Sequence, residues 1–196
     1  MSALDPSHAL HVIRASTGDA HRALEHNLEI ARADADDGAY VRYLQAVFGW
    51  LEPLEAPLWS PAWPAQVRST ERSGKTAWLL ADLEARGFCG AQVRSLPRQR
   101  LLPPLASLAH RFGVAYVVEG AQLGGQALLR RLGPRLFPRP TRWLEGYGVH
   151  AAERWRSFLR ALDASVCDAH DVQAAAHSAR ATFEIVHAWF SARGVA

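Results

Sequence analysis

Lysine, long apolar segments and signals for export are the scarce features of this 196-residue chain. Lysine occurs once, at Lys75, so nearly all positive charge is arginine, and the formal net charge of +3 does not demand a nucleic-acid partner. No run of about 20 apolar residues is present, which excludes a membrane-spanning helix. The first residues are charged and polar, so we expect no secretory signal peptide.

Cysteine is also rare, with only Cys89 and Cys167 far apart in the chain. Neither cysteine lies in a C-x-x-C or C-x-x-C-H pattern, which argues against a zinc site and against a covalently attached cofactor. Two free thiols are typical of a reducing compartment. We therefore expect a cytoplasmic protein.

Residues that favour β-strands are sparse, whereas alanine, leucine and arginine are abundant and 49% of the residues are hydrophobic. A chain of this length is long enough to bury one substantial core. We expect an all-α fold in which residues 1–196 form a single domain, a helical bundle.

Turn residues and helix-capping signals divide the chain. Asp5 is placed to cap the first helix, with Pro6 at its first position. Pro53 and Pro57 are expected to kink or end the second helix, and Gly133 with Pro134 to close the long central one. The expected helices cover residues 5–32, 39–59, 76–86, 105–132, 148–164 and 168–192, and residues 60–75, 95–104 and 139–147 are expected to connect them.

One polar stripe on the first helix is unusual. Residues three, four and seven apart share a helix face, so Arg14, Thr17, His21 and Glu25 form one line bordered by apolar residues. Such a stripe is typical of a helix that presents a histidine to a large flat ligand. The alternative is a core helix with a half-buried, hydrogen-bonded histidine.

Three glycines interrupt the apolar pattern of the central helix, at Gly120, Gly124 and Gly125. Each costs about 1 kcal/mol relative to alanine within a helix. Their density predicts a close approach of the backbone to a ligand, together with a kink. The alternative is tight packing of two helices through small residues.

These stretches resemble the haem oxygenase family, and in particular its bacterial, biliverdin-producing branch associated with bacteriophytochromes. Its landmarks follow in the expected order over most of the chain. They are Thr17-x-x-x-His21-x-x-Leu24-Glu25, Glu119-Gly120-x-x-Leu123-Gly124-Gly125-Gln126, Gly146-Tyr147-Gly148 followed by Trp155-x-x-Phe158, and Ala181-Thr182-Phe183.

The resemblance implies a haem oxygenase-like bundle in which haem is both substrate and cofactor. The family uses O2 and electrons to cleave haem into biliverdin, carbon monoxide and ferrous iron. No flavin or dinucleotide motif occurs here, so a separate reductase or ferredoxin is the expected electron donor. The product would supply a bacteriophytochrome or release iron, with neither nucleic acid nor a membrane as a partner.

The resemblance also assigns roles to residues. His21 is the expected axial ligand of the haem iron, and Thr17 belongs to the same haem-binding stripe. Glu25 is a candidate partner for the second ring nitrogen of His21, or else a surface carboxylate that pairs with Arg22. Arg14, two turns before His21, can reach a haem propionate, and Arg156 is a weaker candidate taken from its family position.

The glycines at 120, 124 and 125 would form the opposite, catalytic wall together with Ala121. Many family members carry an aspartate where this chain has Ala121, and that aspartate organises a water molecule. We therefore expect a water held by backbone groups here. Ala121 also keeps open a haem carrier or sensor without catalysis. A third possibility is a related bundle acting on a thiamin-related pyrimidine, which would need acidic and cysteine side chains in its pocket.

Overall fold

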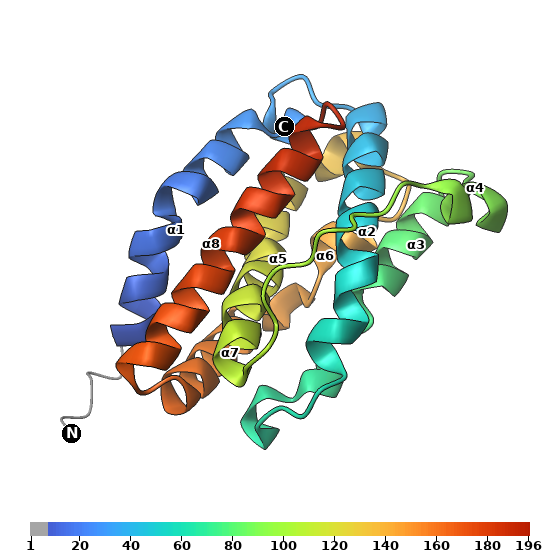
Figure 1. The fold of residues 1–196 in the computed structure, drawn as a ribbon. Coiled ribbons are helices and arrows are strands. Elements are labelled where there is room, and N and C mark those ends of the chain that lie inside the picture. The colour runs from blue at the N-terminus through green and yellow to red at the C-terminus, as the bar shows by residue number, and fades with distance from the viewer. Residues whose placement is uncertain (1–7) are drawn as a thin grey trace.

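Long helices build the whole molecule, and residues 8–196 of the computed structural model contain no β-strand (Figure 1). The expected cap at Asp5 and Pro6 lies outside the described residues. The α-helices are α1 (His8–Asn27), α2 (Asp37–Trp59), α3 (Lys75–Glu84), α4 (Gly90–Ser95), α5 (Leu108–Leu136), α6 (Arg142–Glu145), α7 (Ala151–Ser165) and α8 (Ala169–Ser191). Short 3-10 turns are η1 (Glu29–Ala31), η2 (Ala65–Val67), η3 (Ser69–Glu71) and η4 (Gly148–His150).

The C-terminal helix α8 organises the bundle because it packs along both α1 and α5 (Figure 1). Side-chain caps fix where the long helices begin: Asp36 accepts from the Ala39 amide, Ser107 from His110 and Asp168 from Asp171. None of the helices in this part of the chain is both long and apolar enough to cross a membrane. The all-α architecture expected from composition is confirmed.

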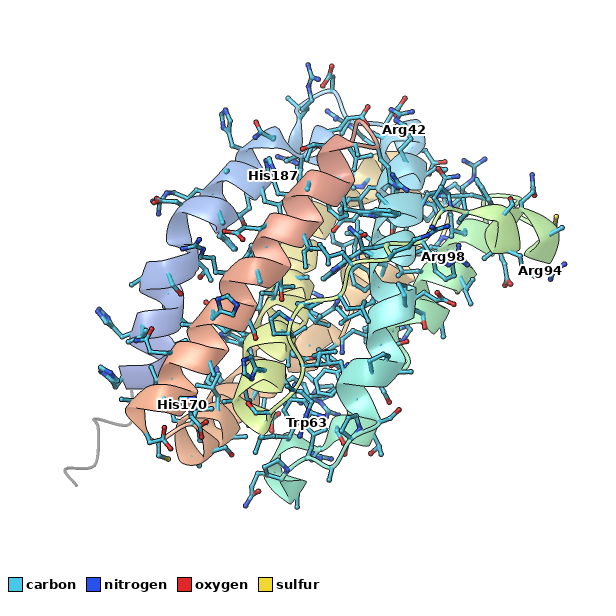
Figure 2. The ribbon with its side chains drawn as sticks, viewed as in Figure 1. Arg42, Trp63, Arg94, Arg98, His170 and His187 are labelled. Carbon is cyan, nitrogen blue, oxygen red and sulfur yellow. The ribbon has the colours of Figure 1, made fainter. Side chains whose placement is uncertain are left out.

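The prolines of α2 lie inside the helix, which continues to Trp59. Pro53 has no N–H, so the carbonyl of Gly49 loses its usual helical donor. The amide of Gln99 donates to that carbonyl instead, at 2.8 Å. The adjacent Arg98 lies on the connection that crosses α2, with its guanidinium 4.5 Å from the ring centroid of Phe48 (Figure 2).

The central helix differs from its predicted limits. Gly133 and Pro134 do not end α5, which runs on to Leu136. The extension buries the side chain of Leu136 in the core, and this burial offsets the unfavourable proline in the last turn. The helix is also unbroken through residues 120–125, so the glycines do not interrupt its hydrogen bonding.

Other differences arise where distant residues complete a local structure. Helix α1 ends at Asn27, before the predicted 32, and the next turn is held by the Glu29 amide donating to the Val195 carbonyl at 2.9 Å. Helix α6 forms within a predicted connection because the Asp82 carboxylate accepts from the amides of Arg142 and Trp143, at 2.7 and 2.9 Å. The short helix α4 was not predicted.

Candidate functional site

A cavity of about 630 Å³ lies within the bundle, a size typical of pockets for sizeable organic ligands. Residues of α1, α2, α5, α6, α7 and α8 line it, and most of their side chains are apolar. Its aromatic lining includes Tyr43 and Trp50 of α2, Tyr116 of α5, Trp143 of α6, Trp155 of α7, and Phe183 and Phe190 of α8. Such a lining suits a broad apolar ligand.

His21 of α1 lines this cavity, and its side chain is 51% exposed. The ring packs edge-on against Phe183, with 5.5 Å between the centroids. Its Nδ1 lies 3.4 Å from Oε2 of Glu25, so Nε2 is the nitrogen left for a ligand. Arg22 pairs with Asp19 and not with Glu25, so the Glu25 carboxylate is the partner of His21.

His21 is also the single histidine among the described residues that line the cavity. His170 and His187 lie near opposite ends of α8 (Figure 2). Tyr43 also lines the cavity, and burial raises the pKa of its hydroxyl. His21 therefore brings to the cavity an imidazole, the side chain that most often binds metals in proteins.

The glycines of α5 divide into two kinds. A Cβ on Gly124 would meet nothing within 4 Å, and one on Gly120 would meet only the Trp155 ring, at 3.9 Å. A Cβ on Gly125 would lie 3.3 Å from the carbonyl oxygen of Leu144. Gly120 and Gly124 thus keep space open in the cavity, whereas Gly125 also allows α5 and α6 to pack closely.

Two arginines reach the cavity from opposite directions. Arg14 precedes His21 by two helical turns and lines the cavity as predicted by the stripe. Arg131 was not predicted, and its Nη2 donates to the Ile30 carbonyl at 3.0 Å, beyond the other end of α1. Arg131 follows Gly124 by seven residues, a spacing that places both on one helix face and could have identified it.

Two predicted residues lie away from the cavity. Thr17 is buried in α1, where its hydroxyl donates to the Ile13 carbonyl at 2.8 Å. Arg156 is an exposed residue of α7, and its neighbour Trp155 takes the place at the cavity. Neither residue is therefore among those that line the cavity. For Arg156 the reason is helix geometry, which turns adjacent residues about 100° apart.

The cavity does not fit the pyrimidine alternative. Glu25 is the one carboxylate among the described lining residues, and no cysteine is among them. Cys89 and Cys167 are both exposed and free. The acid and thiol groups that such a reaction would need are not gathered at this site.

Comparison with known proteins identifies the chain's relatives. No curated protein gives a match. The family model described as Heme oxygenase matches residues 7–192, which is nearly the whole chain. The histidine and glycine features that line the cavity all fall within this match. The chain therefore belongs to the haem oxygenase family.

Proposed function

We propose that this protein is a haem oxygenase that cleaves haem to biliverdin, carbon monoxide and ferrous iron. The observation that carries this proposal is the pairing of His21 with Glu25 at the same cavity that Gly120 and Gly124 keep open. Bound haem supplies the iron at which O2 is activated and is itself the molecule oxidised. The chain's own part is to hold, orient and shield it.

His21 Nε2 would bind the iron, with the Glu25 carboxylate fixing the ring through Nδ1. Either Arg14 or Arg131 can pair with the propionates, since both line the cavity and an arginine fork matches a carboxylate. The aromatic side chains of α2 and α8 would cover the apolar ring edges. This set matches haem in charge, shape and ligand type.

On the oxygen side, Ala121 lines the cavity with a methyl group that cannot hold a water molecule. The amides of α5 are occupied in the continuous helix, but a helical carbonyl oxygen keeps a second lone pair. We propose that the carbonyl oxygens of residues 120–124 hold the water that delivers the proton. Ordering such a water costs only about 0–2 kcal/mol.

Electrons would come from a separate reductase or ferredoxin. The two exposed free cysteines suit a reducing cytoplasm. Membership of the bacterial branch and delivery of biliverdin to a bacteriophytochrome are proposed from the sequence resemblance alone.

A second candidate is a haem carrier or sensor without catalysis, which Ala121 favours. The deciding experiment adds one equivalent of haem, then O2 with ascorbate, and follows the absorption spectrum. An enzyme loses its Soret band while a biliverdin band grows. A stable Soret band identifies a carrier, and a spectrum identical to free haem in buffer refutes both functions.

A further inference from the structure

A charged cluster lies buried behind one wall of the cavity. We call Arg72, Lys75, Glu119 and Tyr147 the Glu119 cluster. The side chains of Arg72, Lys75 and Glu119 are at most 1% exposed. The Glu119 carboxylate accepts from Arg72 Nη1, from Lys75 Nζ at 2.7 Å and from the Tyr147 hydroxyl at 3.1 Å. Glu119 is thus the point where several segments meet.

The two cations have few other charged neighbours. Lys75 Nζ lies 5.4 Å from the Trp59 ring and 5.2 Å from the Tyr147 ring, and it also donates to the Arg72 carbonyl. Burial lowers the pKa of Lys75, while the charge of Glu119 opposes that shift. Glu119 is therefore the carboxylate that both buried cations contact directly, while Glu55, which accepts from the Lys75 backbone amide, adds a further negative charge nearby.

The same cluster joins α5 to α7. Arg72 Nη2 donates to the carbonyl of Arg154 at 3.1 Å and to the hydroxyl of Ser157 at 3.0 Å. Trp155, between these two residues in sequence, lines the cavity. Glu119 directly precedes Gly120, the glycine whose Cβ position is nearest to Trp155. The cluster therefore sits behind the part of the wall that Gly120 and Trp155 form.

We propose that Glu119 is a positioning residue, which holds the glycine face of α5 toward the substrate and fixes its spacing from Trp155. The proposal rests on the proposed function only in naming haem as that substrate. Glycines have no side chains, so they cannot fix the orientation of the helix by packing on the side that faces the cavity. Glu119, about 100° around the helix from Gly120, can set the rotation of α5 about its axis at this point.

Energetics favour this role over simple stabilisation. Buried ion networks are often no more stabilising than apolar side chains of similar volume, whereas they can specify one arrangement among several. Here the four partners come from the residue after η3, from α3, from α5 and from the α6–α7 junction, so only one orientation of α5 satisfies them all. With that orientation lost, haem would be seated in more than one way and would open at more than one position.

The test compares Glu119→Gln with a triple variant, Arg72→Met with Lys75→Met and Glu119→Leu, which replaces all three charges. Arg86→Met is the matched control, because Arg86 is equally buried but pairs with Asp37, away from α5. Hydrogen exchange of residues 117–128 is measured in the protein without haem, and the ring-opened products are separated by chromatography.

We expect the triple variant to keep its melting temperature yet to exchange about tenfold faster over residues 117–128 and to yield a mixture of product isomers. Glu119→Gln should change in the same direction, and Arg86→Met should leave both readouts at wild-type values. The positioning role is overturned if the triple variant exchanges residues 117–128 at the wild-type rate. It is also overturned if the exchange rate rises equally over α5 and α8. If the wild type fails to degrade haem, the proposed function fails, and the exchange comparison still decides this inference.

Discussion

Gly113 of α5 lies directly against the backbone of Ala175 in α8. A Cβ on Gly113 would overlap the Ala175 carbonyl oxygen and lie 2.9 Å from the carbonyl carbon. Neither backbone can move without separating the two helices. We predict that Gly113→Ala lowers the free energy of unfolding by about 1–3 kcal/mol, as overpacked sites do. Urea denaturation measures it, and an unchanged midpoint would contradict the close contact.

Gly124 should behave in the opposite way. A Cβ there meets open space, and alanine is favoured over glycine in a helix by about 1 kcal/mol. We predict that Gly124→Ala raises the stability of the haem-free protein while weakening haem binding, and that Gly124→Leu prevents binding in a folded protein. Equal haem affinity in Gly124→Leu and wild type would show that the space serves no ligand.

His21→Ala should remove the axial ligand and little else. The His21 side chain is half exposed, so we expect a change in unfolding free energy within about 0.5 kcal/mol. The ferric haem spectrum should change, and added imidazole should restore it by entering the vacated position. His26→Ala, an exposed neighbour outside the cavity lining, is the control. A wild-type spectrum in His21→Ala would identify a different ligand.

Arg14 and Arg131 test how haem is seated. The two propionates project from one edge of haem, whereas Arg14 belongs to the N-terminal half of α1 and Arg131 contacts the chain just beyond its C-terminal end. We predict that only one of Arg14→Gln and Arg131→Gln weakens haem binding, by about 1 kcal/mol or roughly fivefold for a solvent-exposed pair. Haem dimethyl ester should bind both variants and the wild type equally. The family resemblance favours Arg14, and a loss confined to Arg131→Gln would mean that haem is turned end to end.

Two buried tyrosines and the partly buried Tyr147 should make the fold sensitive to alkali. Burial raises the pKa of Tyr40, Tyr43 and Tyr147, with Asp82 and Glu119 adding to the shift at Tyr40 and Tyr147. Above pH 10 the unfolded chain releases these protons while the folded chain keeps them. Stability should then fall by about 1.4 kcal/mol per pH unit for each such tyrosine.

Lys75 has the opposite effect at lower pH. Its lowered pKa means that the folded chain binds fewer protons just below 10.5, so its contribution to stability rises with pH up to that value. Because three tyrosines oppose one lysine, the net fall is still expected above about pH 10. Absorbance at 295 nm and circular dichroism should change together, and Tyr40→Phe should make the fall less steep. Tyrosine ionisation that clearly precedes unfolding would contradict the buried environments.

The helical class and the approximate position of most helices could be predicted because capping and 3.6-residue periodicity are local signals. His21, Gly120 and Gly124 could be placed at the cavity for the same reason. Helix α6 could not, since its cap is Asp82, some 60 residues earlier. The burial of Thr17 could not be predicted, because a stripe on a helix does not show that its hydroxyl donates to the Ile13 carbonyl within the helix. The roles assigned to these residues in haem binding stay predictions.

The hydrogen bond from the Gln99 amide to the Gly49 carbonyl couples helix α2 to the connection that crosses it. An ordinary helix satisfies its interior carbonyls by itself, so it can form before the rest of the chain arrives. In α2, Pro53 leaves the carbonyl of the buried Gly49 without its helical donor. Water can donate to this carbonyl only while the helix is exposed. If α2 were buried without residues 97–99, this carbonyl would have no donor, so the proline makes the stability of the helix depend on a neighbouring segment.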